Sequence, residues 1–209
     1  MNRSTIALMG PNQPARGVRA RARAAMRAEV AAAVQNLVLE RGYEETTVED
    51  ICAAAEISRS TFFRYFPSKE DALFGAVADA GERLRAALTA RPPDEPPWVA
   101  MRRALDVLIE QYEAHDERIR RLTRLIVNTP ALAARHREKN ARWHALLRPE
   151  VARRLEADPA DGSDPRADAV IGAALACVEA ALTAWTSNDQ PQPLATILDR
   201  AMGAFAPPA

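Results

Sequence analysis

Glycine and cysteine are scarce in this chain of 209 residues, which has 8 glycines and 2 cysteines. A composition rich in alanine, leucine, arginine and glutamate with so little glycine favours helix almost throughout. Cys52 and Cys177 lie far apart and form no CxxC pair, so the sequence argues against a disulfide framework and predicts a reduced intracellular protein. No apolar run approaches the roughly 20 residues of a membrane span, which predicts a cytoplasmic location away from the membrane.

The motifs of catalysis and metal binding are missing as well. His115, His136 and His144 show no HExxH or similar pairing, and they are more often ordinary polar residues of helices. The sequence also has no glycine-rich phosphate loop and no nucleophile elbow. We therefore expect no catalytic residue, no metal site and no cofactor.

Positive and negative charges balance at 28 each, but their distribution along the chain is uneven. The first 28 residues contain no acid and carry six arginines, namely Arg3, Arg16, Arg19, Arg21, Arg23 and Arg27. Such a segment is often only a solvated tail, and it is also typical of an arm that follows a phosphate backbone. We expect residues 1–18 to form a disordered basic arm.

Helical periodicity and capping residues predict three helices between residues 19 and 67. The first runs from about residue 19 to Gly42, and Thr46 with Glu49 has the spacing of a capping box that opens the second. Ser58 is a good N-cap for the third, which Pro67 stops. Two short helices joined by a tight turn after a longer helix form a helix-turn-helix unit, in which the second short helix enters the DNA major groove.

An aromatic cluster lies within that second short helix. At helical spacing Phe62 and Phe66 share a face and are expected to anchor the helix to a small core. The polar residues on the other face can reach bases and phosphates, which are hydrogen-bonding surfaces. The plainer alternative is a capped three-helix core with an aromatic centre. It explains the rings but leaves the outward Arg59, Thr61 and Lys69 unexplained.

The segment TTVEDICAAAEISRSTFFRYFPSKEDAL, residues 46–73, closely resembles the DNA-binding domain of TetR-family transcriptional regulators. The resemblance covers about residues 20–75 and implies that a short set of residues binds DNA, namely Thr47, Arg59, Ser60, Thr61, Arg64, Tyr65 and Lys69. The sequence departs from the family at two positions. Glu56 replaces a frequent glycine in the turn, and Phe63 replaces a frequent tyrosine whose hydroxyl contacts phosphate.

Residues 68–209 are again helical and are predicted to form a ligand-binding and dimerisation domain, so that the all-α chain has about nine helices. The proline-rich stretch RPPDEPPW interrupts the pattern after residue 90. An apolar pocket is expected within this domain. Its candidate lining residues are Trp98, Tyr112, Leu125, Trp143 and Leu147, although each is more often plain core.

The last two predicted helices carry an apolar seam at spacings of three and four residues. A second row of small residues, Gly172, Ala176, Ala180 and Ala184, would let another helix approach closely. The resemblance implies that these helices pair with their copies in a four-helix bundle across a two-fold axis. The interface would then contain Ile171, Leu175, Val178, Leu182, Trp185, Leu198, Met202 and Phe205. Alternatively, the seam only completes the core of one chain.

The sequence therefore predicts a homodimeric regulator that binds an inverted-repeat operator, most often as a repressor by family resemblance. Its C-terminal part is also similar to actinobacterial mycofactocin-associated regulators, some of which respond to acyl-CoA. This similarity suggests a small apolar or acyl-type effector. A ligand-independent architectural DNA-binding protein is the alternative.

Overall fold

The computed structural model describes residues 13–75, 80–114, 116–188 and 192–205. Most of the expected basic arm, residues 1–12, lies outside this range, and the described chain is helical from Gln13. The described residues contain helices and no strand, which confirms the all-α class. They divide into two compact units, residues 1–76 and residues 77–209.

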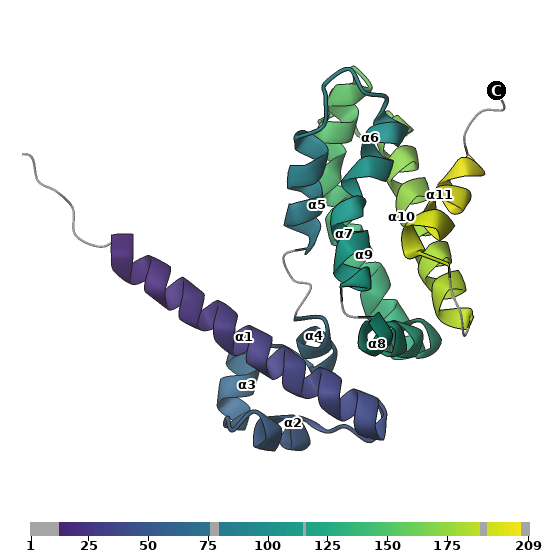
Figure 1. Cartoon of the computed structure of the whole chain (residues 1–209). Helices are drawn as coiled ribbons and strands as arrows, with labels where there is room; N and C mark the ends of the chain where they lie inside the picture. Colours follow the sequence, from purple (N-terminus) through teal and green to yellow (C-terminus); the bar gives the residue numbers. More distant parts are fainter. Residues whose placement is uncertain (1–12, 76–79, 115, 189–191, 206–209) are drawn as a thin grey trace, which may run out of the picture. The chain divides into compact units, whose positions relative to one another are not determined.

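The N-terminal unit consists of one long helix and three short ones (Figure 1). The long helix α1 (Gln13–Arg41) packs against α2 (Val48–Ala54) and α4 (Lys69–Leu73), and α2 packs against α3 (Arg59–Tyr65). Their buried apolar side chains form a small core that includes Val30, Val34, Ile51, Phe62, Phe66 and Leu73. Helix α4, which lies in the part of the chain that we assigned to the C-terminal domain, packs on α1 in this unit.

The capping box of α2 lies one residue later than the sequence analysis predicted. Thr47 is the N-cap, its hydroxyl accepts from the amide of Asp50 at 3.1 Å, and the Asp50 carboxylate accepts from the amide of Thr47 at 3.0 Å. Thr46 is buried in the preceding turn, where its hydroxyl donates to the Gly42 carbonyl at 2.8 Å. The prediction that Thr46 and Glu49 form the box is wrong, and Glu49 has no part in this cap.

The turn into α3 has a left-handed residue at the position where the family often has glycine. Glu56 adopts a left-handed conformation with φ of 52°, which a residue with a Cβ atom adopts at a cost of about 1 kcal/mol. Ser58 then caps α3, since its hydroxyl accepts from the amide of Thr61 at 3.1 Å. Ser68 caps α4 in the same way through the amide of Asp71.

The C-terminal unit contains seven helices within its described residues. These are α5 (Ala80–Thr89), α6 (Pro97–Ala104), α7 (Asp106–Glu113), α8 (Asp116–Asn128), α9 (Pro130–Arg154), α10 (Arg166–Ser187) and α11 (Leu194–Gly203). The described chain thus has eleven helices rather than about nine, and Leu105 separates two of them, α6 and α7. Helix α10 packs against α6, α8, α9 and α11 (Figure 1).

Helix α10 is the core helix of this unit. Ile171, Leu175 and Leu182 are buried in a cluster with residues of α5, α6, α7, α9 and α11. By length and composition alone α10 is also apolar enough to cross a membrane, which the sequence analysis did not expect of any segment. The buried core helix of a soluble protein passes the same test, so this feature is weak evidence for a membrane span.

Two close contacts fix α9 against α5 and the loop that follows it. The fully buried side chain of Arg154 donates to the carbonyls of Leu88 and Arg91 at 3.0 Å, and its Nε donates to Glu150 at 2.9 Å. Gly81 lies so close to the Trp143 indole that a Cβ atom would come within 2.6 Å of the ring. Since a side chain at this position would collide with the indole ring, the packing of α5 against α9 requires glycine at residue 81.

Candidate nucleic-acid interface

Helix α3 presents a polar face on a rigid apolar support. Arg59, Ser60 and Arg64 are exposed and Thr61 is half-buried, whereas Phe62 and Phe66 are 0% exposed. The prediction that the two rings anchor the helix is therefore confirmed. Arginine, serine and threonine side chains can reach base edges and phosphates from such a helix.

Helix α1 adds two arginines at the C-terminal end of α3. The guanidinium of Arg27 lies 4.3 Å from the centre of the Phe66 ring and donates to the Tyr65 carbonyl. Arg23 lies one turn earlier, with its guanidinium 5.7 Å from the ring of Tyr65. From the sequence, both arginines were expected only as members of a basic segment. Their i, i+4 spacing was the signal that they share one helix face.

Lys69 is tied to the turn between α1 and α2. Its ammonium donates to the carbonyls of Tyr43 at 3.0 Å and Thr46 at 3.1 Å, and it lies 4.1 Å from the centre of the Tyr43 ring. The Tyr43 hydroxyl donates to Glu70. Burial raises the pKa of Tyr43, and the nearby Glu70 carboxylate raises it further. Burial raises the pKa of Glu70, but hydrogen bonds from Tyr43 and Ser68 lower it by more, so the pKa of Glu70 lies below its ordinary value. A phosphate contact by Lys69 stays a prediction.

Thr47 and Tyr65 are placed differently from the outward residues of α3. Thr47 is exposed at the start of α2, and its hydroxyl also donates to Asp50 at 2.6 Å. Tyr65 is half-buried, and its ring lies 5.4 Å from the guanidinium of Arg64. Both side chains lie in the same unit as the polar face of α3, and their DNA contacts stay predictions.

An acid and an aromatic ring flank Arg59. The Glu49 carboxylate on α2 forms an ion pair with the Arg59 guanidinium. The Phe63 ring, 47% exposed, has its centre 5.8 Å from the same guanidinium. Phe63 meets the buried Phe62 ring edge to face at 5.3 Å between centres. Arg59 is therefore contacted by a carboxylate and by an anchored ring.

The five candidate pocket residues lie at different places in the C-terminal unit, and only Tyr112 lines the apolar cavity described below. Trp143 and Leu147 are buried in the core, while Leu125 on α8 is half-buried. Trp98 meets Phe205 with 5.9 Å between ring centres. Tyr112, whose pKa burial raises to about 12, lines an apolar cavity of about 10 Å³ between α7, α10 and α11.

Most of the predicted interface seam is buried within a single chain. Six of its eight residues are at most 7% exposed: Ile171, Leu175, Leu182, Trp185, Leu198 and Met202. Val178 is half-buried and Phe205 is 61% exposed. The row of small residues, in contrast, is exposed along its whole length from Gly172 to Ala184. The seam thus occupies the core of one chain, whereas the small-residue row is open to a partner.

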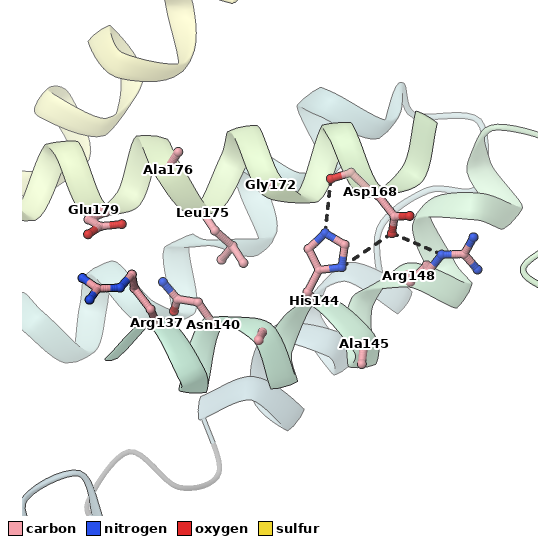
Figure 2. Close-up of a pocket in the computed structure, with 11 residues that line it drawn as sticks. Arg137, Asn140, His144, Ala145, Arg148, Asp168, Gly172, Leu175, Ala176 and Glu179 are labelled. Atoms are coloured by element: carbon pink, nitrogen blue, oxygen red, sulfur yellow. Dashed lines mark hydrogen bonds and ion pairs between the residues drawn. The ribbon is translucent and has the colours of Figure 1, made fainter. Parts of the chain in front are cut away.

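Next to the small-residue row, an open groove of about 630 Å³ lies between α9 and α10 (Figure 2). Its α9 side carries Arg137, Asn140, His144 and Arg148, and its α10 side carries Asp168, Gly172, Ala176 and Glu179. His144 Nε2 lies 3.2 Å from the Asp168 carbonyl, and Arg148 donates to the Asp168 carboxylate at 3.2 Å. Among the residues that the structure describes, no three His, Cys, Asp or Glu side chains gather as a metal site.

Positive charge accumulates on α8 and α9. Residues 116–148 contain nine arginines or lysines and three acids in a chain whose net charge is zero. Arg120 is buried, and the Lys139 ammonium lies 4.3 Å from the centre of the Trp143 ring. Burial lowers the pKa of Lys139 to about 8. Burial, with Lys139 and Arg137 nearby, lowers the pKa of His136 to about 4.

Comparison with known proteins relates both units to one family. Residues 30–77 match the family described as bacterial regulatory proteins, tetR family, and residues 95–209 match the MftR C-terminal domain. The HTH-type transcriptional regulator TcmR of Streptomyces glaucescens is 33% identical over 162 residues, which cover 75% of this chain and 71% of TcmR. The HTH-type transcriptional regulator EthR of Mycolicibacterium smegmatis is 29% identical over 131 residues, or 60% of this chain and 55% of EthR.

Solved structures share the fold at lower identity. Thermus thermophilus FadR in complex with lauroyl-CoA has a TM-score of 0.57 at 22% identity, over 88% of this chain and 97% of that one. Bacillus subtilis FadR in complex with stearoyl-CoA has a TM-score of 0.57 at 18% identity, and the match covers 84% of this chain and 95% of that one. The protein is thus a DNA-binding transcriptional regulator rather than an enzyme, and it belongs to the TetR family.

Proposed function

We propose that this protein is a cytoplasmic homodimeric repressor that binds an inverted-repeat operator and is released from it by a small apolar or acyl-type effector. The observation that carries the proposal is the polar face of α3, where Arg59, Ser60 and Arg64 are exposed above two fully buried rings. A surface of this kind fits the hydrogen-bonding edges of the major groove.

Two such helices in a two-fold dimer would contact two half-sites. Their centres would lie about one helical turn apart, roughly 34 Å or slightly more, because each recognition helix must enter the major groove on one side of the duplex. Sequencing the DNA that the purified protein retains from a random library tests this proposal. The expected product is an inverted repeat, and retention without any enriched sequence would contradict it.

The dimer contact that we propose is the exposed small-residue row of α10 together with the adjoining groove. Gly172, Ala176, Ala180 and Ala184 recur every four residues, so they form a shallow strip on which a second helix can pack closely. The buried seam is unsuitable because its side chains already pack within one chain. The partner's α10 and α11 are the proposed occupants of this strip, as in the four-helix bundle that family resemblance implies.

The effector site that we propose lies in the C-terminal unit, where the cavity beside Tyr112 would have to expand. At about 10 Å³ it now holds no more than about one water molecule, so an acyl chain requires α7, α10 or α11 to move. The excess of cations on α8 and α9 favours an anionic head group. The FadR structures contain lauroyl-CoA and stearoyl-CoA, so we include long-chain acyl-CoAs among the compounds to test.

The required change in operator occupancy determines how strongly the effector must prefer one state of the protein over the other. To take operator occupancy from nearly full to nearly empty, it must bind the DNA-incompetent state about 10⁴-fold more tightly, or about 5.5 kcal/mol. By linkage, DNA must weaken effector binding by the same factor. The test is release from the selected operator by acyl-CoAs, fatty acids and planar aromatic compounds. Release by an acyl-CoA but not by its free acid would indicate that the coenzyme phosphates contact the cations.

A ligand-independent architectural DNA-binding protein is the second candidate. The small volume of the cavity beside Tyr112 favours it, since such a protein needs no effector pocket. The two proposals differ in one measurable outcome. If no compound in the panel changes operator affinity, and if transcription from an operator-bearing promoter is insensitive to the same compounds, the architectural account is the better one.

A further inference from the structure

We infer that Glu49 and Phe63 determine the base preference of this regulator. In this account Glu49 directs the Arg59 guanidinium toward a guanine, and Phe63 contacts the methyl group of a thymine one or two base pairs away. The inference rests on the proposed role of α3 in reading DNA. It assigns functions to an acid and a ring that the DNA-contact set above does not contain.

Glu49 is available for this role because it does not cap α2. The capping carboxylate belongs to Asp50, while the Glu49 carboxylate reaches α3 and pairs with Arg59. Both side chains are well exposed, 59% for Glu49 and 62% for Arg59. An exposed pair of this kind contributes little to stability, so its main effect is on the direction of the arginine.

A directed guanidinium suits recognition of guanine. Arginine presents five N–H donors in a planar fork, and Glu49 can occupy part of that fork while the rest faces guanine O6 and N7. A carboxylate at the polar face also repels phosphates, which weakens binding to DNA of any sequence. Glu49 therefore favours specific over non-specific binding in two ways.

Phe63 lies on the same side of α3 as Arg59. The two residues are four positions apart, which is about 6 Å along a helix and close to the rise of two base pairs. The Phe63 ring is held by the buried Phe62 and is still 47% exposed. Phenylalanine has no hydroxyl for a phosphate, and the apolar group that the major groove offers is the thymine methyl.

The experiment measures binding to the selected operator after a single functional group of one base is changed. Replacing one thymine by deoxyuridine removes only its methyl group, and replacing one guanine by 7-deazaguanine exchanges only the N7 acceptor for a C–H group. At the position that Phe63 contacts, deoxyuridine should weaken wild-type binding about fourfold, the value of one buried methyl group, and should leave the Phe63→Ala variant unaffected.

Glu49→Gln keeps the shape of the side chain and removes its charge. This variant should bind scrambled DNA more tightly than wild type and should lose most of its discrimination between guanine and 7-deazaguanine. Glu45→Gln is the matched control, since Glu45 is an exposed acid of the same unit without an ion pair to Arg59. It should raise affinity for scrambled DNA but keep the discrimination.

The outcomes separate this inference from the proposed function. If deoxyuridine weakens wild type and Phe63→Ala equally at every thymine, or if Glu49→Gln and Glu45→Gln discriminate guanine equally, the inference is overturned while DNA reading by α3 stands. If the wild-type protein selects no DNA sequence, the proposed function fails and this inference fails with it.

Discussion

Lys69 holds the turn that precedes α2 by donating from its ammonium to the Tyr43 carbonyl at 3.0 Å, with the Tyr43 ring 4.1 Å away. The same ammonium donates to the Thr46 carbonyl at 3.1 Å. A residue that family resemblance assigns to a DNA phosphate is thus also part of the domain's own structure. Variants at this position affect folding and DNA binding together.

We predict that Lys69→Met lowers the free energy of unfolding by about 1–3 kcal/mol, because two carbonyls lose a charged donor. Urea unfolding of the full chain, followed by circular dichroism, measures this change. Arg64→Met is the matched control, since Arg64 is exposed on α3 and its loss should change stability by about 0.5 kcal/mol or less. Equal stability of Lys69→Met and wild type would contradict the structural role.

The dimer proposal predicts different outcomes for two arginine substitutions on α10. Ala180→Arg places a charge on the exposed row and should give a folded monomer. Leu182→Arg places it in the core of the chain, where Leu182 is 2% exposed, and should unfold the C-terminal unit. Sedimentation and circular dichroism distinguish these results.

Ala86→Arg, on an exposed position of α5, provides the control and should remain a folded dimer. If Ala180→Arg sediments as a dimer at micromolar concentration, the exposed row is not the interface. A monomeric wild-type protein would exclude both the dimer and the two-half-site operator.

Two neighbouring arginines of α9 should differ sharply in their contribution to stability. Arg154→Met removes the donor to the carbonyls of Leu88 and Arg91 and one partner of Glu150, so it should cost about 3 kcal/mol. Arg153 also pairs with Glu150 but its side chain is 50% exposed, and Arg153→Met should cost less than about 1 kcal/mol. Thermal unfolding of both variants makes the comparison. Equal losses would refute the structural role of Arg154.

His136 should make the C-terminal unit sensitive to acid. Burial lowers its pKa from an ordinary 6.5 to about 4, so between these values the unfolded chain binds more protons than the folded one. Stability should therefore fall as the pH drops from 6.5 toward 4. His136→Leu should flatten this part of the pH profile in urea unfolding, whereas an unchanged slope would show that His136 is not its source.

The helices of the N-terminal unit could be predicted from the sequence because local signals mark them. Ser58 was correctly predicted as a cap, and Phe62 and Phe66 as the anchor, because each signal acts over three or four residues. The cap of α2 was misplaced by one residue for a simple reason. Two adjacent threonines are each followed, three positions later, by an acid, and spacing alone does not choose between them.

Features that depend on tertiary packing were harder to predict from the sequence. Periodicity identified an apolar seam on the last two helices, but an apolar face has the same pattern whether its own chain or a partner covers it. The structure places Leu182 and Trp185 in the core of one chain. Contacts such as Arg27 with the Tyr65 carbonyl join residues 38 positions apart, which local patterns cannot foresee.

The most direct test of the central claim, that α3 reads an inverted repeat, is the affinity of Arg59→Ala for the selected operator and for scrambled DNA. We predict a loss of about 1–3 kcal/mol on the operator, or roughly 5- to 150-fold, with a much smaller change on scrambled DNA. Equal losses on both DNAs, or no loss on the operator, would contradict the account.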